Sequence, residues 1–137
     1  MSIDWSEKNN VGIKIIDNQH SKIIEQFNRV EKVMEMGTHN RQLKSEIEKL
    51  EEIIETHFAT EERYMKNNHY PEMNNHINEH GIYLKNIYLI KNAISLKSKK
   101  SVIFQTISLQ IVNWYTNHIS THDSKLSEFL IDMNIAV

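Results

Sequence analysis

Cysteine is absent from this sequence, and glycine and proline are scarce, with three and one among 137 residues. Without cysteine the chain forms no disulfide and offers a metal ion no thiolate, so nitrogen and oxygen atoms would have to hold any bound metal. Few glycines and prolines argue against a β-rich fold, which needs many tight turns. The composition also fits a reducing compartment, where disulfides are rare.

The sequence also lacks a strong charge of either sign and any long apolar run. Its formal net charge is −2, and Lys99-Lys100 is its one adjacent pair of basic residues, so charge predicts neither a nucleic-acid partner nor an anionic membrane partner. No stretch approaches the roughly 18 apolar residues of a transmembrane helix, and the N-terminus has no apolar signal core. We therefore expect one cytoplasmic domain that spans residues 1–137.

Apolar residues recur three and four positions apart, which is the spacing of one face of a helix. Asp17 is expected to cap the first helix, and Pro71 is expected in the first turn of the third. Before the first helix we expect an irregular arm, in which Trp5 packs against the helices. The predicted helices cover residues of about 17–37, 40–66, 71–94, 101–118 and 123–133.

Short connections between amphipathic helices favour antiparallel neighbours. We therefore predict an all-α fold, an up-down-up-down antiparallel four-helix bundle with an irregular N-terminal arm and a short C-terminal helix. The buried faces are expected to carry aliphatic residues together with Met34, Tyr64, Leu84 and Trp114.

Seven ionisable residues fall on faces that the bundle should bury. On the second predicted helix the apolar face runs from Leu43 to Ile54, and the next two steps along it reach His57 and Glu61. An unpaired carboxylate or imidazole in a core costs several kcal/mol, so seven of them would unfold a small domain unless metal binds them. The full set is His20, His57, Glu61, His76, His80, His118 and Asp123.

The spacing of these residues allows them to act in pairs. Residues four apart share a helix face, which applies to His57 with Glu61 and to His76 with His80. His118 and Asp123 are five apart, or about 140° around a regular helix, and cannot both point inward from one. We therefore expect the fourth helix to end within a residue or two of His118, with residues 119–122 bringing Asp123 back to the core.

The number of potential ligands predicts two metal ions. Imidazole and carboxylate without sulfur suit iron, manganese or zinc. Five histidines, two bridging carboxylates and one shared oxide or hydroxide would make eleven bonds, whereas two six-coordinate ions need twelve. One position would remain free, so a small ligand could bind at one of the two metals.

The order and spacing of these residues closely resemble the hemerythrin family, in particular its single-domain bacterial members. No single motif would be sufficient, but together they cover nearly the whole chain. The matching pieces are Val11-Gly12-Ile13, Ile16-Asp17-Asn18-Gln19-His20, His57-Phe58-Ala59-Thr60-Glu61-Glu62, Tyr70-Pro71, His76-Ile77-Asn78-Glu79-His80, and Trp114-Tyr115-Thr116-Asn117-His118-Ile119 through Asp123.

The resemblance implies a non-enzymatic protein that binds dioxygen reversibly, for storage, delivery or sensing. Its cofactor would be two iron ions with a bridging oxide or hydroxide, and any sensing output would need a separate protein partner. By resemblance, His76, His80 and His118 hold one iron, His20 and His57 hold the other, which has the free position, and Glu61 and Asp123 bridge the two.

The resemblance also implies a narrow, dry pocket beside the free position. Tyr115 stands where the family is expected to have leucine or another apolar residue. A hydroxyl there would either stabilise bound oxygen or speed oxidation of the irons. The expected wall of the dioxygen pocket is Ile23, Phe58, Trp114, Tyr115 and Ile119.

Two kinds of enzyme are alternatives to dioxygen binding. The same centre could act on peroxide, nitric oxide or another small oxidant. Residues 76–80 also fit a His-x-x-Glu-His metalloprotease signature, with Glu79 as general base and zinc as the metal, but that interpretation leaves the other five residues unexplained. Glu62 is expected beside the centre or at the surface, and His122 is expected to face elsewhere.

Overall fold

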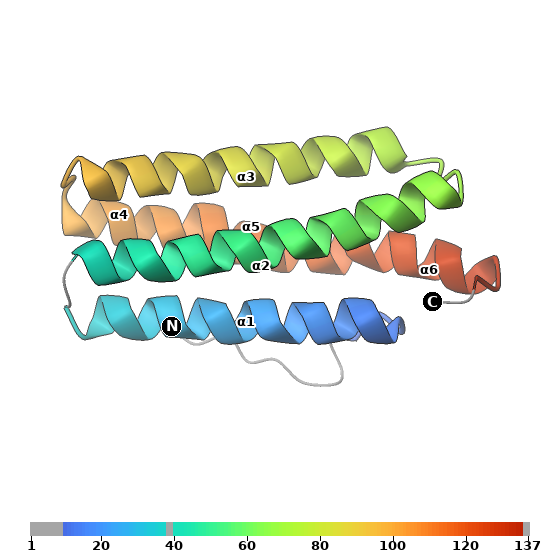
Figure 1. The fold of residues 1–137 in the computed structure, drawn as a ribbon, viewed down its shortest axis with the longest axis horizontal. Coiled ribbons are helices and arrows are strands. Elements are labelled where there is room, and N and C mark those ends of the chain that lie inside the picture. Colours follow the sequence, from blue (N-terminus) through green and yellow to red (C-terminus); the bar gives the residue numbers. More distant parts are fainter. Residues whose placement is uncertain (1–9, 38–39, 136–137) are drawn as a thin grey trace.

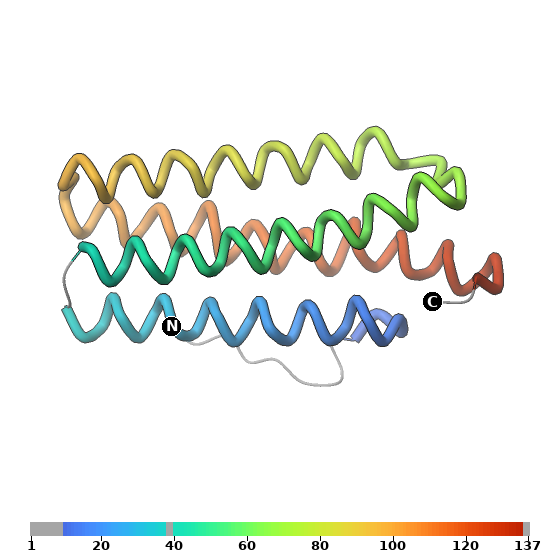
Figure 2. Tube along the Cα trace, in the orientation of Figure 1, coloured from blue at the N-terminus to red at the C-terminus, as the bar shows by residue number. Residues whose placement is uncertain are grey.

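Four helical rods lie side by side in the computed structural model, which describes residues 10–37 and 40–135 (Figure 1). The first three rods are α1 (Lys14–Glu35), α2 (Asn40–Asn67) and α3 (Met73–Ser95). The chain reverses direction between successive rods, as the predicted up-down-up-down bundle requires (Figure 2). Trp5 lies outside the described residues. None of the described helices is long and apolar enough to cross a bilayer.

The fourth rod is one unbroken helical run in which two segments have the wider π-helical hydrogen-bonding pattern. Its last part, the predicted short C-terminal helix, follows without an intervening loop and extends the rod beyond α1 and α3 (Figure 1). The segments are α4 (Lys100–Thr106), the π-helical η2 (Ile107–Asn113), α5 (Trp114–His118), the π-helical η3 (Ile119–Asp123) and α6 (Ser124–Asp132).

The prediction that Asp17 caps α1 is wrong: Ile13 directly precedes the helix, and it makes no side-chain capping hydrogen bond. The helix begins at Lys14, earlier than predicted, and Asp17 lies within its first turn. The Asp17 carboxylate accepts hydrogen bonds from the backbone N–H groups of Val11 at 2.7 Å and Gly12 at 3.2 Å, so it ties the preceding segment to the helix. At the other end Gly37 has φ +63°, a left-handed conformation that ends helices.

Helix α3, by contrast, begins later than predicted. Pro71 belongs to the turn before the helix, which starts at Met73, and His69 next to that turn has φ 51°. Some core positions differ as well, because Met34, Tyr64, Leu84 and Trp114 are only half-buried. The neighbouring residues Val33, Met65, Tyr83 and Tyr115 are buried in their place.

The interior consists of two apolar clusters with a polar layer between them. The larger cluster includes Ile23, Ile54, Ile87 and Ile119. The smaller, towards the other end, contains Ile13, Ile16, Met65, Tyr70, Leu126 and Leu130. Polar residues separate the two apolar clusters along each of these helices: His20 on α1, His57 and Glu61 on α2, and Asp123 on the fourth rod. Burial of these apolar faces holds the polar layer in place.

Candidate metal centre

All seven ionisable residues singled out from the sequence meet in the polar layer. Each is at most 2% exposed, and each rod contributes at least one of them. We call this set the polar cluster, and its members are His20, His57, Glu61, His76, His80, His118 and Asp123. A cluster this polar, shielded this fully from water, needs compensating bonds to be stable.

Two histidines, from α1 and α2, form one side of the polar cluster. The Nε2 atoms of His20 and His57 are 3.2 Å apart. The Asp123 atom Oδ2 lies 2.8 Å from the first of these nitrogens and 3.5 Å from the second. Three donor atoms therefore converge on one point.

The other side is formed by α3 and the fourth rod. The Nε2 atoms of His76 and His118 each lie 3.1 Å from Oδ1 of Asp123. The Nε2 atom of His80 lies 3.2 Å from Oε1 of Glu61. Asp123 therefore directs one carboxylate oxygen to each side of the cluster.

Glu61 also lies between the two sides. Its Oε1 atom is 3.3 Å from Nε2 of His57 and 3.7 Å from Nε2 of His76. Both carboxylate oxygens are buried, and neither has a hydrogen-bond partner among the described residues. Buried polar atoms left unbonded in this way require an explanation, such as an ion that binds them.

The π-helical segment η3 lets His118 and Asp123 point to the same place. We expected the helix to break after His118, and this was wrong: the chain stays helical through Ile119–Asp123. A π-helix bonds each N–H to the carbonyl five residues earlier, so residues five apart share a face. Such segments occur frequently at functional sites.

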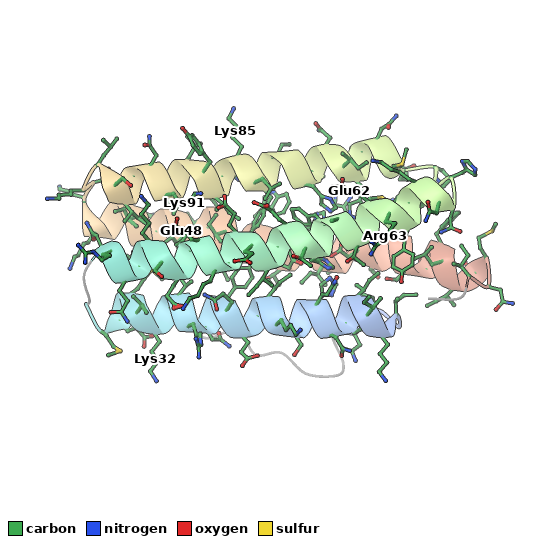
Figure 3. The ribbon with its side chains drawn as sticks, viewed as in Figure 1. Lys32, Glu48, Glu62, Arg63, Lys85 and Lys91 are labelled. Atoms are coloured by element: carbon green, nitrogen blue, oxygen red, sulfur yellow. The ribbon has the colours of Figure 1, made fainter. Side chains whose placement is uncertain are left out.

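The histidines on α2 and α3 are oriented by partners on their outer nitrogens. Nδ1 of His57 donates to Oε1 of Gln19 at 2.6 Å, and Nδ1 of His80 donates to Oε2 of Glu62 at 2.9 Å. Glu62 lies between α2 and α3 (Figure 3) and contacts His80, so of the two places expected for it, beside the centre or at the surface, it takes the first. In a neutral imidazole whose Nδ1 carries the proton, Nε2 presents a lone pair, and this is how metal-binding histidines are commonly held.

Burial keeps these imidazoles neutral. It lowers the pKa of His57 from 6.5 to about 4, although Asp123 acts in the opposite direction. Burial, reinforced by the neighbouring His76 and His118, lowers the pKa of His80 to about 2. Their Nε2 lone pairs are therefore available to a metal ion at neutral pH.

The two carboxyl groups respond oppositely to the same environment. Burial and the neighbouring Asp123 raise the pKa of Glu61 well above 4.5. Burial also disfavours ionisation of Asp123, but the surrounding imidazoles, His118 foremost, outweigh it and hold the pKa of Asp123 well below 3.8. A bound cation would allow Glu61 to ionise as well, because a positive charge favours the carboxylate form.

The five residues expected around the dioxygen pocket all lie close to the polar cluster or in the apolar cluster beside it. Ile23, Phe58, Tyr115 and Ile119 are buried, and Trp114 packs half-buried against them. The hydroxyl of Tyr115 is buried and has no hydrogen-bond partner among the described residues.

Three of these aromatic rings contact the histidines directly. Phe58 stacks on His80 with ring centroids 3.7 Å apart, and Trp114 stacks on His118 at 5.0 Å. Both therefore lie against the three-histidine side. Tyr115 lies 6.1–6.4 Å from the rings of three histidines, including His118, and so borders both sides.

The polar cluster suits metal binding both by the chemistry of its donor atoms and by the way these atoms fall into two groups. Its donors fall into two overlapping groups that share Glu61 and Asp123, and within each group the donor atoms lie within 4.8 Å of one another. One group adds His20 and His57, and the other adds three histidines, from α3 and α5. Imidazole and carboxylate donors without sulfur are suited to first-row transition metals.

A family comparison agrees with this geometry. Residues 11–130 match the model of the hemerythrin HHE cation binding domain. The chain belongs to the hemerythrin family. The fold expected from the sequence resemblance is thereby confirmed, and the buried polar cluster is the part of this hemerythrin-family chain that is equipped to bind cations.

Curated relatives of this hemerythrin-family chain are named bacteriohemerythrin. The protein of Pseudomonas aeruginosa strain PAO1 is 27% identical over 120 residues, which cover 88% of this chain and 76% of the relative. That of Stenotrophomonas maltophilia is 26% identical over 90% of this chain and 78% of its own. That of Campylobacter jejuni serotype O:2 is 24% identical, covering 84% of this chain and 85% of the relative.

Two partners of the cluster were missed or set aside in the sequence. Gln19 directly precedes His20, but nothing in the helical period indicates that its amide reaches His57 on another helix. His122 was expected to face elsewhere, yet its ring stacks on His118 with centroids 5.1 Å apart. His118 and His122 are four apart in the sequence, and this helical spacing is the signal that could have indicated their contact.

Proposed function

We propose that this protein binds dioxygen reversibly at a di-iron centre held by the polar cluster. The observation that carries the proposal is the pair of donor groups that share Glu61 and Asp123. Each of these carboxylates has two oxygens and lies between histidines on both sides, so the donors are arranged for a pair of ions rather than for one. His76, His80 and His118 would hold one iron, and His20 and His57 the other.

Iron accounts best for this set of donors within the family. Structural zinc sites favour four ligands and cysteine, which this chain lacks. The histidines divide three to two, so with both carboxylates and a bridging oxide or hydroxide one iron would keep a free position. A di-iron centre with such a position supplies the two electrons that dioxygen takes up and returns.

The chain's own part is to keep that position dry and narrow. Ile23 and Ile119 are at most 3% exposed, and Phe58 is 2% exposed, so bulk water has no direct contact with the cluster. The Tyr115 ring borders histidines of both groups. Its hydroxyl has no partner among the described residues and could donate a hydrogen bond to a small ligand. A ligand held by a hydrogen bond and surrounded by apolar walls is protected from proton transfer and displacement by water.

Repeated oxygenation separates this function from its rival, an enzyme acting on peroxide, nitric oxide or another small oxidant. Protein reconstituted anaerobically with Fe²⁺ would be exposed to oxygen, purged with argon and re-exposed while visible spectra are recorded. We expect an iron charge-transfer band that appears and disappears over several cycles. Irreversible bleaching, or catalytic consumption of added peroxide, would instead identify an enzyme.

A further inference from the structure

The polar cluster is closed on all sides, so a metal ion needs a path to it. None of its seven members is more than 2% exposed. An ion arriving from solvent must exchange its water ligands for protein ligands before it reaches the interior. A metal site is complete only with such a path.

One place in the described residues joins the cluster to half-exposed metal-binding side chains. Donor atoms of Glu79, His118 and His122 lie within 4.8 Å of one another. His118 belongs to the polar cluster, whereas Glu79 and His122 are only half-buried. Of the three donor groups found in the described residues, this one alone has partly exposed members.

The backbone explains why these side chains meet. Glu79 directly precedes His80 on α3, and His122 directly precedes Asp123 on η3. Each therefore lies beside a member of the cluster but is turned towards its edge. The His122 ring stacks on His118 at 24° and also lies 5.6 Å from the ring of His76.

Glu62 is the other half-exposed acid in contact with the cluster, and it is less suited to receive an ion. Its side chain is 29% exposed, and its carboxylate accepts a hydrogen bond from Nδ1 of His80. In the described part of the chain it joins no group of three donors. Glu62 holds His80 in place, whereas Glu79 and His122 add two further donor atoms beside His118.

We propose that Glu79 and His122, together with His118, form a loading site that receives a divalent metal ion and passes it to the polar cluster. The inference rests on the proposed metal centre. Two imidazoles and one carboxylate suit iron(II) and leave the remaining positions to water, so the ion is held loosely. Because His118 belongs to both groups, an ion held there already lies beside the polar cluster, where the other donors of the three-histidine group would replace Glu79 and His122.

Loading kinetics test this proposal without any oxygen chemistry. Cobalt(II) would be mixed anaerobically with metal-free protein in a stopped-flow instrument, and its visible absorption would report when it enters the protein. We expect the double variant Glu79→Gln, His122→Asn to load about tenfold more slowly, since a local negative charge and two ligands are lost. Both proteins should reach the same final cobalt content.

Matched variants isolate the loading site from general charge effects. Glu72→Gln removes an equal charge from an exposed acid just before α3 and should load like the wild type. Glu79→Asp keeps a carboxylate and should load faster than Glu79→Gln. Circular dichroism would establish that each variant is folded.

Two results would overturn the loading site. One is an unchanged loading rate in the double variant. The other is a lower final cobalt content in a folded double variant, because the residues would then belong to the centre itself. If the wild type bound no cobalt or iron at all, the proposed metal centre would fail, which is a separate and recognisable outcome.

Discussion

Gln19 on α1 accepts a hydrogen bond from Nδ1 of His57 on α2 at 2.6 Å, across 38 positions of sequence. Its amide nitrogen donates to Oγ1 of Thr60 at 3.0 Å, and that hydroxyl donates to the carbonyl of Thr56 at 3.1 Å. The chain of bonds sets the direction of the Gln19 amide and fixes the proton of His57 on Nδ1. The Nε2 lone pair is thereby aimed into the polar cluster.

Replacing Gln19 with leucine should therefore weaken metal binding. Loss of a partner that orients a metal-binding histidine typically reduces affinity about 10–100-fold. Competition between the protein and a chelator for Co²⁺ would measure the change. Gln42→Leu, at an exposed position near the start of α2, is the control and should bind as tightly as the wild type. Equal affinity in both variants would contradict the role of Gln19.

Glu61→Ala should lose metal content and metal-dependent stability together. Glu61 contributes to both donor groups, so its removal opens both sides of the centre. Bound metal stabilises the fold by about 3–4 kcal/mol at metal concentrations 100 to 1,000 times the dissociation constant, and most of this should disappear. Elemental analysis and thermal melting would measure the two effects. The exposed Glu55→Ala is the control, and two metals retained in Glu61→Ala would refute the bridging role.

Tyr115→Phe and Tyr83→Phe should change the stability of the metal-free protein in opposite directions. Tyr115 buries a hydroxyl without a partner among the described residues, and its removal should stabilise the fold by about 1 kcal/mol. Tyr83 is equally buried, but its hydroxyl donates to the carbonyl of Ile111 at 2.9 Å, so its removal should destabilise the fold by about 1 kcal/mol. Urea unfolding with a chelator present would measure both.

Ligand binding then distinguishes the two tyrosines in the iron-loaded protein. If the Tyr115 hydroxyl donates to a small ligand, Tyr115→Phe should bind azide more weakly, by about fivefold to tenfold for one lost hydrogen bond. Tyr83→Phe should bind azide like the wild type. Destabilisation by Tyr115→Phe together with unchanged azide affinity would show that the hydroxyl has a structural partner instead.

The metal-free protein should be most stable near pH 6.5. His57 and His80 have pKa values of about 4 and about 2 in the folded state, so below pH 6.5 the unfolded chain binds two protons that the folded chain does not. Glu61 acts oppositely, because its raised pKa keeps a proton on the folded chain above pH 4.5, where the unfolded chain loses it. Below pH 6.5 the two histidines determine how the free energy of unfolding changes with pH, and above pH 6.5 the Glu61 carboxyl group does. Stability therefore falls as the pH moves away from 6.5 in either direction.

Urea unfolding of chelator-treated protein between about pH 4.5 and 8 would test this profile, with slopes of about 1 kcal/mol per pH unit. Glu61→Gln removes the carboxyl group that titrates, so it should abolish the decline on the alkaline side. It should also make the rise on the acidic side about twice as steep, because Glu61 no longer offsets one of the two histidines. A wild-type stability that rose steadily with pH would contradict the raised pKa of Glu61.

Much of the fold and the polar cluster was predictable because both follow from helical spacing. Each of the seven residues stands where an apolar face continues, or close to it, and burial of those faces determines which side chains meet. Tyr64 and Met65 show the limit of helical spacing as a guide. The spacing predicts that Tyr64 is buried, but Met65 is buried and Tyr64 is only half-buried. A helix can rotate by part of a residue spacing when it packs against its neighbours.

The sequence by itself determined the four amphipathic helices, the absence of sulfur ligands and the seven polar residues on buried faces, because periodicity and composition are local properties. Only the tertiary structure decided that Ile119–Asp123 widens into a π-helix, that Gln19 and Glu62 hold two histidines, and which oxygen of Asp123 faces which side. These features depend on contacts between residues far apart in sequence. Neighbouring helices must be in place before a wider turn or a single rotamer becomes the stable one.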